Sequence, residues 1–196
     1  MPAATRTIAM SESINLEQVV TARFEEIETL ADRLIGLAAN RGLRLVTAES
    51  CTAGMLAHRL SRAVGAAAVL AGGFVTYTKT TKTQLVGVSP ELLAACTAVH
   101  ANIAEAMARG ALERGGADLA LAITGVTGAE PDEDGNPIGR VFVGFAAAGN
   151  AASLHCEFGR LAPAALSHLT VQAALTFALA QLGDPVAHRL LHGAGD

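Results

Sequence analysis

The sequence predicts a single α/β domain in which helices cover both faces of a mixed sheet, as a three-layer α/β/α sandwich. Three observations predict this class. Helical and short apolar strand patterns alternate over the first two-thirds of the chain. A hairpin pattern and a long helical pattern then close it. Finally, 196 residues that are 51% hydrophobic and 16% charged can form one substantial core.

The helices are predicted from apolar residues at helical spacing and from capping signals. The first covers residues 16–39 and ends near Gly42, which suits a left-handed cap. Ser89-Pro90 predicts a helix with proline at its first position. Further helices are expected over 52–63, after the polar start of 78–86, and over 103–114 and 163–182.

The strands are predicted from short apolar runs at 43–48, 69–77 and 118–124, each ending at polar residues or glycines. In Rossmann-like sheets the ligand lies where strand ends meet helix starts. We therefore expect the polar ends of these three strands to converge.

The end of the chain predicts an antiparallel hairpin of 140–148 and 153–158, with Gly149-Asn150 as the turn pair. We place the domain at residues 16–182. Residues 1–15 are expected to be a flexible lead, and 183–196 a flexible tail rich in Gly, Asp and Pro.

Composition excludes several functional classes. A net charge of −4 argues against nucleic-acid binding, and no apolar run approaches the roughly 18 residues of a membrane span. Cys51, Cys96 and Cys156 are an odd set without C-x-x-C spacing, which favours reduced thiols in the cytoplasm over disulfides or zinc. The low charge also suggests that another subunit covers some apolar surface.

The stretch from Thr47 to Gly54 contains hydroxyl and thiol side chains between the end of a predicted strand and the start of a predicted helix. The first N–H groups of a helix lack internal partners and suit a phosphate, a carboxylate or an oxyanion. We expect Thr52 to cap this helix. Ser50 or Cys51 is then free to face a ligand, but not both.

A second polar stretch contains Tyr77, Lys79 and Lys82, at the end of the next predicted strand. A lysine whose pKa is lowered by burial or by a cationic neighbour can act as the base for a nearby hydroxyl. The alternative is an amphipathic edge tyrosine beside solvated lysines.

A third stretch, Thr124-Gly125-Val126-Thr127-Gly128, follows the third strand and is either a phosphate-binding loop or an ordinary tight turn. His100 is expected to be either a helix cap or a surface group, and His58 is expected to lie on a helix face. The acidic segment Asp132-Glu133-Asp134 is expected to be solvated, and no metal site is assigned.

Taken together, four blocks of the sequence resemble the CinA C-terminal domain family, whose stand-alone members include the nicotinamide mononucleotide deamidase PncC. They are Thr47-Ala-Glu-Ser-Cys-Thr52, Gly73-Phe-Val-Thr-Tyr77 with Lys82, Thr124-Gly-Val-Thr-Gly128, and Asn136-Pro-Ile-Gly139. Their order and spacing match over roughly residues 20–182.

This resemblance implies hydrolysis of the carboxamide of nicotinamide mononucleotide to nicotinate mononucleotide and ammonia, without metal or organic cofactor. It implies Ser50 as nucleophile, Tyr77 and Lys82 as its assistants, and N–H groups around Cys51 and Thr52 as the oxyanion site. A homo-oligomer, with a dimer favoured, is also expected. The expected substrate contacts are Glu49, Lys79, Thr124, Gly125, Thr127, Gly128 and Arg140.

The chain departs from the family pattern at several positions. Ala53-Gly54 replaces Gly-Gly, Thr78-Lys79 replaces Ser-Asn, Ala129 replaces Pro, His100 replaces Ser, and Asn136-Pro-Ile-Gly-Arg140 replaces Lys-Pro-Val-Gly-Thr. If the missing lysine contacts phosphate, Arg140 or Lys79 must replace it. Two alternatives therefore stay open: a non-catalytic nucleotide-binding or oligomerisation module, and an amidase of the same mechanism with another small amide substrate.

Overall fold

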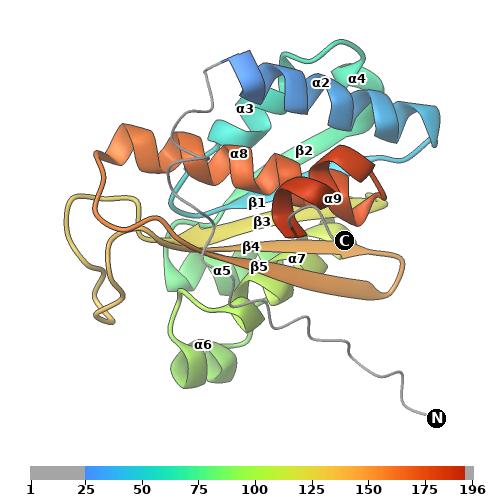
Figure 1. Ribbon diagram of the computed structural model, residues 1–196. Helices are drawn as coiled ribbons and strands as arrows, with labels where there is room; N and C mark the ends of the chain where they lie inside the picture. The colour runs from blue at the N-terminus through green and yellow to red at the C-terminus, as the bar shows by residue number, and fades with distance from the viewer. Residues whose placement is uncertain (1–24, 193–196) are drawn as a thin grey trace.

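The computed structural model describes residues 25–192, and a five-stranded mixed sheet lies at its centre (Figure 1). The strand order is β2-β1-β3-β4-β5. The first three strands in the sequence are parallel to one another, whereas β4 and β5 run antiparallel. The strands are β1 (Leu45–Glu49), β2 (Leu70–Val75), β3 (Leu119–Gly125), β4 (Arg140–Ala147) and β5 (Asn150–Glu157).

Helices cover both faces of this sheet, which confirms the predicted three-layer α/β/α sandwich (Figure 1). One layer contains α2 (Glu25–Asn40), α3 (Met55–Ser61), α4 (Ala66–Val69), α8 (Pro163–Gln181) and α9 (Pro185–His192). The opposite layer contains α5 (Lys79–Val86), α6 (Pro90–Cys96) and α7 (Ala101–Gly115).

Each helical layer packs a separate buried cluster against the sheet. Alternate residues of a strand point to opposite faces, so Leu45 joins the cluster under α2 and α8, while Val46 joins the cluster under α7. The whole of β1 is buried because β2 and β3 flank it and helices cover both faces. Because β1 is held on all sides, Ser50, the residue that follows it, has a fixed position at the edge of the sheet.

By length and composition α8 could cross a membrane. However, 56% of its apolar window is buried inside the protein, where Leu166, Leu175 and Leu179 belong to the main core cluster. This is the pattern of a core helix.

Several local signals act as predicted. Gly42 adopts a positive φ of 65° after α2, and Ser89 caps α6 with Pro90 at its first position. Apart from these predicted signals, Gly73 permits a close approach of a side chain, since a Cβ there would lie 2.5 Å from the hydroxyl oxygen of Thr47. The three cysteines, Cys51, Cys96 and Cys156, are free thiols in the structure.

Three boundaries differ from those predicted. The helix expected over 52–63 begins only at Met55, with Gly54 at its N-cap (φ 99°), so the prediction that Thr52 caps it is wrong. The tight turn of the hairpin is Ala148-Gly149, both with positive φ, and β5 already begins at Asn150. Helix α5 begins at Lys79, where a polar loop was expected, because Thr78 forms a capping box with Thr81.

The segment expected as a flexible tail contains α9, so that prediction is wrong for Pro185–His192. Asp184 accepts the N–H groups of Val186 and Ala187, and it pairs with Arg33 of α2. Asp-Pro here is a cap followed by proline at the first helical position. Residues 16–24 of the first predicted helix, and the lead at 1–15, lie outside the described residues.

Gly110 of α7 provides a test of the packing that holds α5. A Cβ at this position would lie 1.7 Å from the carbonyl oxygen of Val86, the last residue of α5. Gly110→Ala should therefore lower the free energy of unfolding by more than about 2 kcal/mol, although alanine is the better helix former. Urea denaturation would measure this change.

Gly36 of α2 is the matched control, because a Cβ there meets nothing within 4 Å. Gly36→Ala should leave stability unchanged or raise it by up to ~1 kcal/mol. Equal stabilities of the two variants would contradict the close contact between α7 and α5.

Candidate active site

The three polar strand ends converge at one edge of the sheet, as predicted. Ser50 follows β1 and Tyr77 follows β2, and the parallel strands bring these residues to the same edge as the end of β3. The carbonyl oxygen of Tyr77 lies 3.4 Å from the Ser50 hydroxyl, and Thr127 donates to the carbonyl of Cys51 at 3.1 Å. The site is thus assembled from segments far apart in the chain.

The central contact joins Lys82 to Ser50. The Lys82 amine donates to the Ser50 hydroxyl oxygen at 2.8 Å and to the carbonyl oxygen of Thr76 at 2.9 Å. Lys82 is 1% exposed and Ser50 7%. The capped start of α5 sets this geometry, because Lys82 lies one turn into a helix that begins a few residues after β2.

Burial, the largest influence, lowers the pKa of the Lys82 amine to about 8, and the charge of Lys79 acts in the same direction. Roughly one amine in ten is then neutral at pH 7. A neutral amine can accept the Ser50 proton while still donating to Thr76, so the arrangement suits general-base activation of the hydroxyl.

Cys51, the competing nucleophile, lacks this activation. Burial raises the pKa of its thiol to about 12, even though a hydrogen bond with Thr127 and the charge of Lys82 act in the opposite direction. The thiol therefore stays protonated near neutral pH, and a thiol is a far weaker nucleophile than a thiolate. The geometry favours Ser50.

Glu49 occupies the anion-binding position at the start of α3. One of its carboxylate oxygens accepts from the Thr52 hydroxyl at 2.6 Å, from Gly54 N–H at 3.1 Å and from Leu56 N–H at 3.0 Å. The other accepts from Ala57 N–H at 2.8 Å. Glu49 is 1% exposed and these hydrogen bonds are all internal, so its carboxylate holds the turn.

This carboxylate decides which backbone donors remain in the turn. The oxygens of Glu49 accept hydrogen bonds from the N–H groups at the start of α3, which were expected to bind an anion such as the oxyanion of an acyl transfer. Ser50, Ala53 and Met55 donate to the carbonyls of Ile123, Ser50 and Thr52 respectively. Within the described residues, the N–H groups of Cys51 and Thr52 donate to no carbonyl of another residue. These two donors follow the nucleophile directly, in the turn that precedes the helix.

The turn also contains backbone strain. Ala53 adopts a φ of 50°, in the left-handed region that favours glycine, at a position where the family pattern has glycine. The adjacent Gly54 has a φ of 99°. The hydrogen bonds to Glu49 offset the cost of this conformation.

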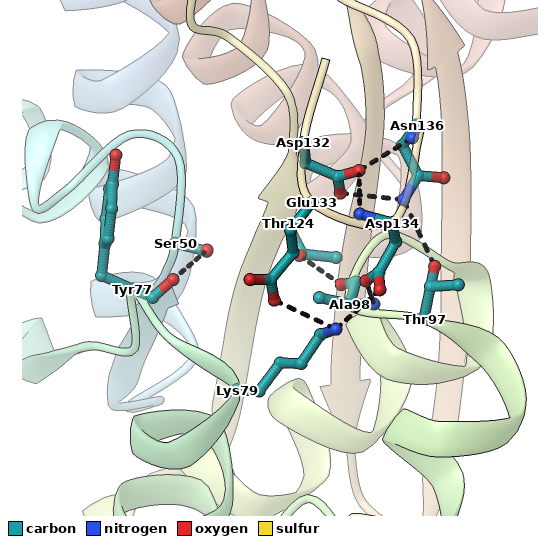
Figure 2. Close-up of polar contacts among 10 residues, drawn as sticks. All are labelled: Ser50, Tyr77, Lys79, Thr97, Ala98, Thr124, Asp132, Glu133, Asp134 and Asn136. Carbon is teal, nitrogen blue, oxygen red and sulfur yellow. Dashed lines mark hydrogen bonds and ion pairs between the residues drawn. The ribbon is translucent and has the colours of Figure 1, made fainter. Parts of the chain in front are cut away.

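The side chain of Tyr77 is placed differently from its expected assisting role. The residue is 67% exposed, and Figure 2 shows its phenol extending away from the Ser50 hydroxyl while its backbone carbonyl points toward it. Lys82 contacts Ser50 directly, so proton transfer between them needs no tyrosine relay.

The glycine-rich stretch Thr124–Gly128, whose first two residues end β3, is held in the protein by the hydroxyl groups of its two threonines. Thr124 donates to the carbonyl of Ala98 at 2.7 Å, and Thr127 donates to that of Cys51. A Cβ at Gly125 would lie 2.7 Å from the carbonyl oxygen of Arg140, whereas Gly128 borders open space. Gly125 therefore has a packing role, and Gly128 remains the more accessible member of the loop.

The two cations expected to contact phosphate are both paired with carboxylates. Lys79 contacts Asp134 at 2.7 Å and Glu133 at 3.0 Å (Figure 2). Arg140 Nε lies 2.7 Å from a carboxylate oxygen of Glu157. The pairing of Lys79 with the acidic loop had no signal in the sequence, because 55 positions separate Lys79 from Asp134.

The histidines lie outside this machinery. His100 caps α7 by accepting the Asn102 N–H, one of the two roles expected of it, and His58 is exposed on α3. Across residues 25–192, no group of three His, Cys, Asp or Glu side chains is arranged to hold a metal ion.

Replacing Glu49 tests its role in the turn. Glu49→Gln keeps the size of the side chain but turns an NH₂ group toward buried donors. It should lower the free energy of unfolding by about 2–3 kcal/mol. Glu113→Gln, on the exposed face of α7, is the control and should stay within ~0.5 kcal/mol of the parent. Chemical denaturation of both variants checks this, and equal values would argue against the carboxylate holding the turn.

Comparison with known proteins agrees with this architecture. Residues 27–182 match the family model described as the CinA C-terminal domain. A CinA-like protein of Mycolicibacterium gilvum is 50% identical over 110 residues, covering 56% of this chain and 26% of the relative. One from Mycolicibacterium vanbaalenii is 43% identical over 151 residues, covering 76% of this chain and 35% of the relative. The chain thus spans about a quarter to a third of these curated relatives.

Solved structures match over nearly their full lengths. The competence-damaged protein (CinA) superfamily protein from Escherichia coli superposes with a TM-score of 0.77 at 36% identity, covering 87% of this chain and 99% of that one. The competence/damage inducible protein CihA from Agrobacterium tumefaciens gives 0.76 at 37% identity, covering 79% and 94%. The chain therefore belongs to the CinA C-terminal domain family.

Proposed function

We propose that this chain is a serine amidohydrolase that cleaves a small carboxamide, with Ser50 as nucleophile and Lys82 as general base. The observation that carries this proposal is the buried Lys82 amine, 2.8 Å from the Ser50 hydroxyl. A buried lysine without a carboxylate partner costs stability, and a purely structural site gains little from it. A binding module would not need this pair, so the non-catalytic alternative is disfavoured.

In the acylation step, the neutral Lys82 amine removes the Ser50 proton and the oxygen attacks the amide carbon. Negative charge develops on the carbonyl oxygen, where the N–H groups of Cys51 and Thr52 can donate to it. An oxyanion donor of this kind is worth about 3–4 kcal/mol in a known protease. The carbon–nitrogen bond then breaks, and the nitrogen leaves as ammonia with the proton held by Lys82.

In the deacylation step, a water molecule gives a proton to Lys82 and attacks the ester carbon. The bond to Ser50 breaks, Lys82 returns the proton to the serine oxygen, and the carboxylic acid is released. The Thr76 carbonyl accepts from the Lys82 amine in the resting site, which keeps the amine directed at Ser50. Over the two steps Lys82 takes up and gives back the same number of protons, so the site returns to its starting state.

The family resemblance suggests nicotinamide mononucleotide as the substrate, with nicotinate mononucleotide and ammonia as products. A second candidate is another small amide, cleaved by the same mechanism. The ion pairs of Lys79 and Arg140 favour it, because these are the two cations that would replace the lysine absent at Asn136. Both candidates share the chemistry at Ser50.

Ammonia release from nicotinamide mononucleotide and related pyridine carboxamides tests the proposed activity. Ser50→Ala should abolish turnover, at a cost of at least ~10³ in kcat, whereas Cys51→Ala should retain most of it. A full burst of product with Ser50→Ala, or its loss with Cys51→Ala alone, would assign the nucleophile to the thiol. If none of these amides is turned over, the proposal that the chain is an amidohydrolase is wrong.

The pH dependence follows from the lowered pKa of Lys82. The base is the neutral amine, so kcat/KM should rise about tenfold per pH unit up to pH ~8 and level off above it. Lys79→Met removes a positive neighbour that lowers the Lys82 pKa, and the midpoint should therefore move upward. A rate that falls between pH 6 and 8, or a midpoint that moves down in Lys79→Met, would contradict Lys82 as the base.

A further inference from the structure

The two N–H groups that follow Ser50 belong to peptide units whose carbonyl groups are both bound inside the protein. The Cys51 N–H shares its peptide with the carbonyl of Ser50, which accepts from the Ala53 N–H at 3.1 Å. The Thr52 N–H shares its peptide with the carbonyl of Cys51, which accepts from the Thr127 hydroxyl at 3.1 Å. A trans peptide is planar, with its N–H and C=O pointing in opposite directions. A bond to the carbonyl therefore also fixes the direction of the N–H.

The two carbonyls are held in different ways. The bond from Ala53 to the Ser50 carbonyl is local and closes a β-turn over residues 50–53. Such a bond does not hold the central peptide of the turn, since turn types I and II differ mainly in a rotation of that peptide by roughly half a turn. Here the central peptide joins Cys51 to Thr52, and its carbonyl is held by Thr127, 76 positions away. The direction of the Thr52 N–H thus depends on a side chain outside the turn.

Thr127 is itself well fixed. It is 6% exposed, and both backbone polar groups of the preceding Val126 are bonded, its N–H to the carbonyl of Arg140 at 2.9 Å and its carbonyl to the N–H of Gly139 at 2.8 Å. The Val126 side chain belongs to the main core cluster. A hydroxyl has one donor and two acceptor positions, so Thr127 can donate to the Cys51 carbonyl and also accept from the Cys51 thiol, to which it is hydrogen-bonded.

We propose that Thr127 is a positioning residue of the catalytic turn, whose hydroxyl holds the Cys51 carbonyl and thereby directs the Thr52 N–H toward the oxygen of the amide under attack. This role rests on the proposed hydrolysis at Ser50. When the serine oxygen adds to the amide carbon, an electron pair of the carbonyl moves onto its oxygen, and a donor aimed there stabilises the new charge. Thr127 acts on this step through the backbone.

Thr52 limits how far the peptide can turn when the Thr127 bond is absent. It is not among the few residues other than glycine that have a positive φ, and a rotation to a type II turn would require one. A β-branched residue resists that conformation. Loss of the bond should therefore tilt the donor without removing it. The expected cost is about 10-fold in kcat, less than the roughly 10²–10³ for a deleted donor in a known protease.

Thr127→Val replaces the hydroxyl with a methyl group of similar size. With the amide that the wild-type chain hydrolyses best, kcat should fall about 10-fold while KM stays within ~2-fold, because the oxyanion exists only after attack. Thr127→Ser keeps the hydroxyl and should restore kcat to within ~3-fold of the wild-type value. The proposal is overturned by an unchanged kcat in Thr127→Val, by a rise in KM alone, or by a serine variant as slow as the valine variant.

Thr170→Val is the matched control for the substitution. The hydroxyl of Thr170 is buried on α8 and has no hydrogen-bond partner among the described residues, so its removal should leave kcat unchanged. Thr127→Ala provides the same test if Thr127→Val does not fold, since it removes the hydroxyl without placing a methyl group against the Cys51 carbonyl. It should show the same fall in kcat.

The direction of the Thr52 N–H can also be measured without turnover. Its residual dipolar coupling in the isotope-labelled full chain should match the structure in the wild type and in Thr127→Ser, and should depart from it in Thr127→Val. The couplings of Val46 and Ala48 in β1 should stay unchanged. An unaltered Thr52 coupling in Thr127→Val would overturn the proposal. If the wild-type chain hydrolyses no amide, the proposed function fails, and this coupling still decides whether Thr127 orients the peptide.

Discussion

The site depends on one buried carboxylate. Glu49 ends the central strand β1 and gathers four donors from the turn and from the start of α3. A buried carboxylate needs such partners, and here the positive end of the helix supplies several of them. The turn is thereby closed around an internal anion. Ser50 is held at the bend of this turn. Within residues 25–192, the N–H groups of the two residues that follow it donate to no carbonyl of another residue.

Lys82 depends on a second constraint, the packing of α5 against α7. Gly110 allows α7 to approach the last carbonyl of α5, and the Thr78 capping box defines where α5 begins. Between these two points Lys82 lies under the sheet edge with the Ser50 hydroxyl and the Thr76 carbonyl as acceptors. The burial that lowers its pKa is therefore a property of helix packing, with the charge of Lys79 as a smaller contribution.

Much of the fold could be predicted because its signals are local. Gly42, Ser89-Pro90 and the apolar strand runs each act within a few residues, and all produced the elements expected of them. The segment 183–196 shows the limit of this reasoning. Gly, Asp and Pro suggested a flexible tail, but Asp184-Pro185 starts a helix once Arg33 of α2 pairs with the aspartate. Gly, Asp and Pro residues can therefore end a helix or begin one, depending on which side chains pack against them in the folded protein.

The sequence by itself determined the order of the elements and the three polar strand ends, since periodicity and turn residues act over short distances. Its resemblance to a known family also predicted Ser50 as the nucleophile, with Tyr77 and Lys82 as its assistants. Only the tertiary structure decided that Glu49 faces inward and that Lys79 and Arg140 are already paired with Asp134 and Glu157. Charges attract whichever partner the fold brings near. Lys79 and its partner are 55 positions apart, and no local pattern encodes that meeting.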